Sequence, residues 1–148
     1  VIKWNKIIKI MNAELSTSKL HDIAHMGMRA TIGVIFIVHG FGKFGNPGFG
    51  GWISSMGIPA EMQIPIALAE FVPGILLLIG VLTRISAALL SIVMLGAIFL
   101  VKGVTSLTGD SGYEFDLILL AASLVVIVSG PGRISISHLI QKIPRILQ

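Results

Sequence analysis

The sequence has no cysteine and few charged side chains. Without a cysteine among its 148 residues, this stretch of chain excludes a disulfide, a thiolate nucleophile and a cysteine-ligated iron–sulfur cluster. Charged residues make up 12% of the sequence and hydrophobic residues 54%, and the mean hydropathy is +0.93. A soluble chain of this length would need much more polar surface to cover one core. The composition therefore predicts an integral membrane protein.

Four apolar segments are candidates to cross the membrane as helices. They are Ala24–Phe41, Ile64–Leu82, Ile85–Val101 and Phe115–Ser129. Since a span needs roughly 17–25 residues, the last segment is short unless residues 112–114 and 130 extend it. The sequence thus predicts an all-α, four-helix membrane bundle over residues 24–132, flanked by the segments 1–23 and 133–148.

Basic residues are distributed unevenly between the two predicted sides of the membrane. Eight lie on the side of the two flanking segments: Lys3, Lys6, Lys9, Lys19, Arg84, Arg133, Lys142 and Arg145. The other side has only Lys43 and Lys102, together with most of the acids. The positive-inside rule then predicts a multi-pass protein of the cell membrane with both termini cytoplasmic. The net charge of +4 reflects this topology, and no basic stripe with interleaved aromatics indicates nucleic-acid binding.

Both flanking segments have the pattern of helices that lie on a membrane surface. Trp4, Ile7, Ile8 and Met11 follow the spacing of one helix face, with lysines on the opposite arc. Residues 136–147 repeat the pattern. We expect an interfacial amphipathic helix at each end, with a docking surface for a partner subunit as the alternative.

One acid, Glu70, lies well inside the second apolar segment. A carboxylate is costly in hydrocarbon, so it needs a partner cation, a proton or a ligand. Counting at 1.5 Å per residue places it roughly 9 Å below the outer boundary. This depth predicts that Glu70 is served by the group at the outer end. Its members are His39, Lys43, Trp52, Lys102 and Glu114.

Other residues in the spans have a structural interpretation. Arg29 lies about half the span away from Glu70 by the same count, and we expect its side chain to reach toward the cytoplasmic headgroups. Gly33 and Gly40 share one helix face and predict close packing of another helix, and Gly74 lies one turn from Glu70. Pro73 predicts a local break that frees a main-chain carbonyl.

The segment 42–63 is rich in glycine and is predicted to be a long outer loop. Residues 52–56 in it predict one helical turn or more, which dips apolar side chains into the interface. A loop of this kind either caps the bundle or lines a pocket. A metal site is not predicted, because His21 and His25 have a metal-ligand spacing but no evident third ligand.

Several motifs, taken in order, resemble those of the DoxX family. They are Gly33-Val-Ile-Phe-Ile-Val-His39-Gly40-Phe-Gly-Lys43, Gly50-Gly51-Trp52, Gly57-Ile-Pro59, Ala69-Glu70-Phe-Val-Pro-Gly74, Gly80-Val-Leu-Thr-Arg84, Gly112-Tyr-Glu114 and Gly130-Pro-Gly132-Arg133. The resemblance extends from about Arg29 to Ser137. It implies a four-helix membrane protein, similar to the large subunit of an archaeal thiosulfate:quinone oxidoreductase or to subunits that associate with redox-stress enzymes.

The resemblance also implies functional positions. The matching residues are His39, Lys43, Trp52, Glu70, Arg84 and Glu114. Where many relatives have a histidine near the end of the third span, this chain has Lys102, which stays charged at neutral pH and does not relay protons as a histidine does.

Two hypotheses follow for the function. In the first, the chain is a non-catalytic accessory subunit of a larger membrane redox enzyme, with the lipid bilayer and other membrane subunits as its partners. In the alternative, it is the membrane subunit of a quinone-linked oxidoreductase and binds no cofactor besides the quinone. Glu70 and His39 would then be catalytic, and the other members of the outer group would bind substrate. Arg29 and Arg84 are structural under both hypotheses.

Overall fold

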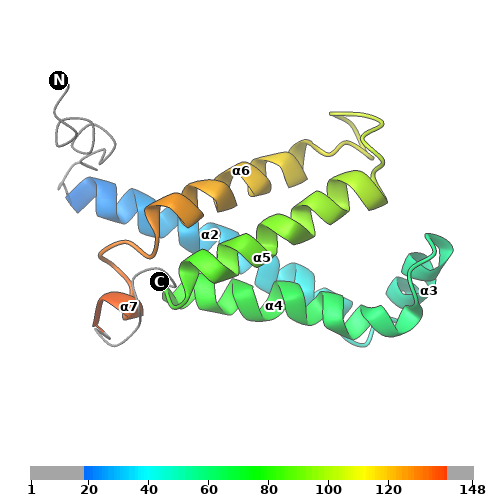
Figure 1. The fold of residues 1–148 in the computed structure, drawn as a ribbon, viewed down its shortest axis with the longest axis horizontal. Coiled ribbons are helices and arrows are strands. Elements are labelled where there is room, and N and C mark those ends of the chain that lie inside the picture. The colour runs from blue at the N-terminus through cyan, green and yellow to red at the C-terminus, as the bar shows by residue number, and fades with distance from the viewer. Residues whose placement is uncertain (1–18, 140–148) are drawn as a thin grey trace, which may run out of the picture.

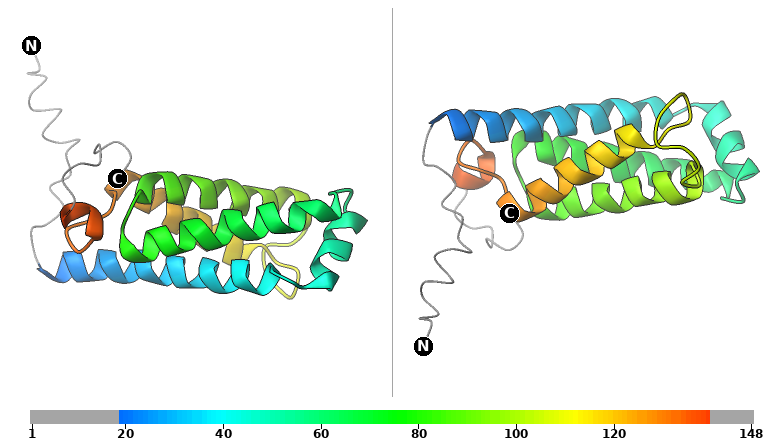
Figure 2. Two further views of the ribbon diagram at one scale, coloured as in Figure 1. Left: turned by 90° about the horizontal axis from the view of Figure 1, so that it is seen from below. Right: turned by 90° about the horizontal axis from the view of Figure 1, so that it is seen from above.

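The computed structural model describes residues 19–139. Four long helices form the bundle (Figures 1 and 2): α2 (Lys19–Lys43), α4 (Gln63–Ile79), α5 (Thr83–Gly96) and α6 (Glu114–Ser129). A π-helical segment, η2 (Ala97–Val101), continues α5. The shorter elements are α3 (Pro47–Ser55), the 3₁₀ turn η1 (Ala60–Met62) and α7 (Ile136–Leu139). The described part of the chain contains no strand, so the all-α prediction is confirmed.

Within residues 19–139, three helical segments are long and apolar enough to cross a membrane: Lys19–Lys43, Ala60–Ile79 and Thr83–Val101. The helix α6 is apolar but has only 16 residues, so the count of four spans stays a prediction. Large apolar side chains point outward along the bundle, for example Val38, Ile92, Phe99 and Val128, which are 61–79% exposed. Such a surface suits contact with lipid.

Glycines bring α2 and α4 together. A Cβ added at Gly33 would lie 2.7 Å from the Gly74 carbonyl oxygen, and one at Gly40 would lie 2.7 Å from the Phe71 nitrogen. Only a residue without a side chain permits backbones to approach this closely. The predicted close packing on the Gly33–Gly40 face is therefore confirmed.

The tight connection between α4 and α5 makes them antiparallel neighbours, as the sequence predicts. Gly80 ends α4 in the left-handed conformation, with φ of 75°, and its amide donates to the Leu76 carbonyl. The second helical hairpin, α5–α6, packs through small and apolar side chains. The core between the hairpins contains Phe36, Leu77, Ala87, Leu90, Leu119 and Val126.

Two predictions about the helices need correction. Pro73 does not break α4, which is continuous from Gln63 to Ile79 with this proline buried inside it. A proline φ near −65° fits a helix, so the cost is one missing hydrogen bond, and packing against α2 holds the helix together. The loop 42–63 is largely helical, and its helix α3 begins at Pro47, five residues before the predicted turn.

The predicted interfacial helices fall mostly outside the described residues. The segment 1–18 and the segment 140–148 lie there. Within the described part, α2 begins at Lys19, before the predicted start of the first span, and α7 occupies four residues of the C-terminal segment.

Candidate functional site

Glu70 is buried between α2 and α4 and is paired with a lysine. Its side chain is 6% exposed and accepts a hydrogen bond from the Lys43 ammonium at the last residue of α2. The Phe49 ring of α3 covers this ammonium, with 5.5 Å from Nζ to the ring centroid. Gln63 donates to the main-chain carbonyls of Lys43 and Asn46, at 2.6 and 2.9 Å, and so fixes the turn between α2 and α3. The carboxylate therefore has a local counter-ion and an aromatic cover.

A second ion pair joins the end of η2 to the start of α6. The Lys102 ammonium lies 2.7 Å from the Asp116 carboxylate and donates to the Gly112 carbonyl at 2.6 Å. The Asp116 side chain is 13% exposed. Sequence reasoning did not select Asp116, because this acid is the second residue of the fourth predicted span and does not lie well inside it as Glu70 does. Lys102 was expected beside Glu70, and this expectation is wrong.

The other members of the predicted outer group do not converge on Glu70. His39 is exposed on α2, and its ring stacks on Phe115 at a centroid distance of 6.4 Å. Trp52 is 47% exposed and contacts the Phe49 ring rather than the acid. Glu114, the first residue of α6, is also exposed. Of the predicted group, Lys43 alone bonds to Glu70 in the described residues.

At the opposite end of the bundle, Arg29 is buried and 2% exposed. Its guanidinium donates to the carbonyls of Leu77 and Leu78 at the end of α4, and to the Ile134 carbonyl at 2.7 Å. The expectation that Arg29 reaches the headgroups is therefore wrong. The last carbonyls of a helix lack partners and carry partial negative charge, so they attract the cation inward.

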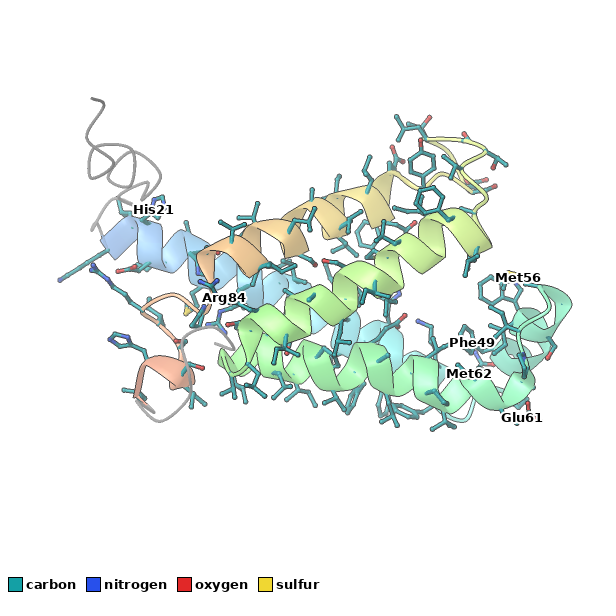
Figure 3. All side chains as sticks on the ribbon, viewed as in Figure 1. His21, Phe49, Met56, Glu61, Met62 and Arg84 are labelled. Carbon is teal, nitrogen blue, oxygen red and sulfur yellow. The ribbon has the colours of Figure 1, made fainter. Side chains whose placement is uncertain are left out.

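Arg84, in the second hairpin, makes a contact related to those of Arg29 in the first. Its Nη2 atom lies 3.4 Å from the Val128 carbonyl near the end of α6, and its guanidinium lies beside Gly130, which ends that helix. Figure 3 shows Arg84 between the ends of α5 and α6. A hydrogen bond of 2.7 Å between His25 and Ser129 also closes this end of the bundle.

The two hairpins thus use the same set of contacts. In each, an arginine binds carbonyls beside a terminal glycine at one end, and a lysine binds an acid at the other. The first set is Arg29, Lys43, Glu70 and Gly80, and the second is Arg84, Lys102, Asp116 and Gly130. The arginine–lysine separations are 14 and 18 residues, and the acid–glycine separations are 10 and 14. Each separation is four residues longer in the second hairpin, which is about one helical turn. The contacts therefore keep the same order along the chain and the same helix faces.

Within residues 19–139, no three histidine and acidic side chains gather as a metal site would require. The lysines and arginines at the ends of the bundle instead contact acids or main-chain carbonyls: Lys43, Lys102, Arg29 and Arg84. Chemically, the arrangement can hold helices in register, and His39 presents an exposed imidazole ring at the outer end of the bundle.

Known proteins resemble this chain over most of its length. Residues 24–103 match the family model DoxX. The Bacillus subtilis (strain 168) protein named "Putative oxidoreductase CatD" is 35% identical over 114 residues, which are 76% of this chain and 84% of that relative. The inner membrane protein YqjF of Escherichia coli (strain K12) is 32% identical over 130 residues, 84% of this chain and 97% of that protein.

A third relative is an uncharacterized membrane protein, Rv3486, of Mycobacterium tuberculosis (strain ATCC 25618 / H37Rv). It is 34% identical over 130 residues, 78% of this chain and 80% of its own length. No solved structure matches the chain.

Proposed function

The chain belongs to the DoxX family of membrane proteins, and we propose that it serves as a non-catalytic subunit of a larger membrane redox enzyme. One observation carries this proposal: Glu70, the buried acid that needs a partner cation, a proton or a ligand, is paired with the Lys43 ammonium. A buried ion pair with good geometry fixes the relative position of the helices that it joins.

The remaining contacts support the same role. Asp116 is paired with Lys102 in the second hairpin, and Arg29 is bound to carbonyls of two segments. The redox setting comes from a relative, since the Bacillus subtilis protein bears the name "Putative oxidoreductase CatD". The cysteine-free sequence has no thiol redox centre of its own, so electrons in such a complex would come from a partner or directly from substrate.

A native pull-down tests the proposal. The tagged chain is extracted in mild detergent, and co-purifying proteins and lipids are identified by mass spectrometry. We expect subunits of one membrane oxidoreductase in stoichiometric amount. Deleting this chain should reduce the amount of the assembled enzyme while leaving the turnover of each remaining complex unchanged. Recovery of the chain only as a free monomer, with enzyme levels unaffected by the deletion, would refute the accessory role.

A second function, a quinone-linked oxidoreductase subunit, is favoured by His39. This histidine is exposed on α2 beside the Phe115 ring, an arrangement that could hold a polar ring at the membrane face. A quinone would supply two-electron redox chemistry, with His39 bonding to a ring oxygen. Glu70 could take part only by exchanging its bond with Lys43. Under this function, His39→Ala lowers turnover without changing assembly, whereas under the accessory role it changes neither.

We also propose that both termini are cytoplasmic. The basic residues of the two flanking segments support this orientation. Because the chain has no native cysteine, single cysteines can report it directly. We expect Ser111→Cys to react with a membrane-impermeant maleimide in intact cells, and Lys19→Cys to react only after permeabilisation. The reverse labelling pattern would invert the topology.

A further inference from the structure

The helix α3 lies across one end of the bundle and carries no charged residue. Figures 1 and 2 show its axis running roughly across the long helices, beyond the end of α2 and the start of α4. Its nine residues read Pro-Gly-Phe-Gly-Gly-Trp-Ile-Ser-Ser. Asn46 caps it, accepting a hydrogen bond from the Gly48 amide at 3.0 Å, and Pro47 occupies the first turn. These signals define a helix start.

One face of α3 packs on the bundle. Ile53 is 2% exposed, and Phe49 faces the bundle, where its ring lies over the Lys43 ammonium (Figure 3). Gly50 allows the helix to sit close to the start of α4, since a Cβ there would lie 2.8 Å from the Gln63 side-chain oxygen. The inner face of α3 is therefore a cover over the Lys43–Glu70 pair.

The outer face of α3 exposes an aromatic ring that no described residue covers completely. Trp52 is 47% exposed, and its ring contacts Phe49 at a centroid distance of 5.6 Å. Nearby segments expose apolar side chains as well. Phe41 near the end of α2 is 67% exposed, Met62 of η1 is 42% exposed and Ile64 of α4 is 48% exposed. These residues connect the outer face of α3 with the lipid-facing surfaces of the two spans.

We propose that α3 docks into the lipid–water interface of the adjacent leaflet, with the Trp52 indole at the level of the headgroups. Tryptophan suits that depth because its ring is apolar and its N–H still needs a hydrogen-bond partner. An uncharged short helix with one aromatic anchor meets no electrostatic barrier there. By this contact, the membrane itself holds Phe49 over the ion pair and keeps water from Lys43 and Glu70.

Tryptophan fluorescence in liposomes tests the docking. Trp4 and Trp52 are the two tryptophans of the chain, so Trp4→Phe leaves Trp52 as the single reporter. The full chain is reconstituted into phosphatidylcholine vesicles that carry bromine near the headgroup end or near the methyl end of the acyl chains. We expect a blue-shifted emission that shallow bromines quench about twofold more than deep ones, since interfacial helices sit ~5–10 Å into the headgroup boundary.

A matched variant places the tryptophan deeper. Trp52→Phe with Ile92→Trp, in the Trp4→Phe background, puts the reporter on the exposed face of α5 near the middle of the span, where Ile92 is 65% exposed. Deep bromines should quench this emission more strongly than shallow ones. Strong quenching of Trp52 by aqueous iodide would overturn the proposal. Protection of Trp52 from both iodide and bromolipids would also overturn it, because the indole would then be covered by protein.

Discussion

Adding one methyl group to Gly33 or Gly40 should separate the two most closely packed helices of the bundle. At Gly33 the new Cβ would lie 2.7 Å from the Gly74 oxygen and 2.9 Å from the Leu78 nitrogen. At Gly40 it would lie 2.7 Å from the Phe71 nitrogen and 2.8 Å from the Ala67 oxygen. All four atoms belong to the backbone of α4, which cannot move aside as a side chain would.

The magnitude follows from the missing space. Ordinary carbon contacts begin at 3.4 Å, so the helices must move apart by about 0.7 Å, a gap that forfeits a quarter to a half of each contact energy along the interface. Overpacking of this kind typically costs about 1–3 kcal/mol. A glycine-to-alanine change also adds helix propensity of about 0.5–1 kcal/mol, which offsets part of that cost. We expect Gly33→Ala and Gly40→Ala each to lower the free energy of unfolding by about 1–2 kcal/mol.

Gly27 provides the control on the same helix, since a Cβ there meets no atom within 4 Å. Unfolding is followed by circular dichroism in detergent micelles as the fraction of a denaturing detergent is raised. Gly27→Ala should be neutral or slightly stabilising, whereas the other two variants unfold earlier. Equal stability of Gly27→Ala, Gly33→Ala and Gly40→Ala would refute the close approach of α2 and α4.

Three further predictions concern the polar contacts, and the same unfolding measurement checks each. Glu70→Gln should lower the free energy of unfolding by about 3 kcal/mol, because it leaves the Lys43 ammonium without a counter-ion. The double change Lys43→Met with Glu70→Leu should recover most of that loss. A double variant that recovers no stability would contradict the pairing. Arg29→Lys should cost about 2 kcal/mol, since one ammonium cannot replace a planar guanidinium that binds carbonyls of two segments; full stability in this variant would argue against the buried position. A double-mutant cycle on Lys102 and Asp116 should give a coupling energy of about 1–2 kcal/mol. This energy should be smaller than that of the less exposed Lys43–Glu70 pair. A coupling energy of zero would contradict the second ion pair.

Features that depend on one helix could be predicted from the sequence. Gly33 and Gly40 are seven residues apart and must share a face of any helix, so their role in packing was accessible. The burial of Glu70 follows from its place in an apolar segment, and its assignment to the outer group that contains Lys43 follows from its depth below the outer boundary.

Features that depend on the identity of a partner segment could not be predicted. Depth counting places Arg29 toward the end of the span opposite to Glu70, but it does not reveal that the free carbonyls of α4 end at the same level. Lys102 and Asp116 meet because the connection 102–113 folds back on itself, with the Tyr113 and Glu114 amides bonded to the Ser106 and Leu107 carbonyls. Asn46 and Pro47 are signals of a helix start and could have predicted where α3 begins. The many glycines around them favoured the interpretation of a loop.

The direction of the helices explains why the two ends of the bundle use different chemistry. Lys43 and Lys102 stand at the C-terminal ends of α2 and η2, while Glu70 and Asp116 lie in the N-terminal halves of α4 and α6. Each ion pair therefore joins a cation at a negative helix end to an anion nearer a positive one.

At the other end, α4 and α6 expose their last carbonyls, and only donors can satisfy them. Arginine is the side chain that offers five donors at a fixed charge, and both hairpins place one there, Arg29 and Arg84. At the buried position of Arg29, an acid would leave carbonyls of two segments unpaired in a place that water reaches poorly. The repeated set of contacts is thus what two antiparallel hairpins need in a membrane, where unpaired helix ends are most costly.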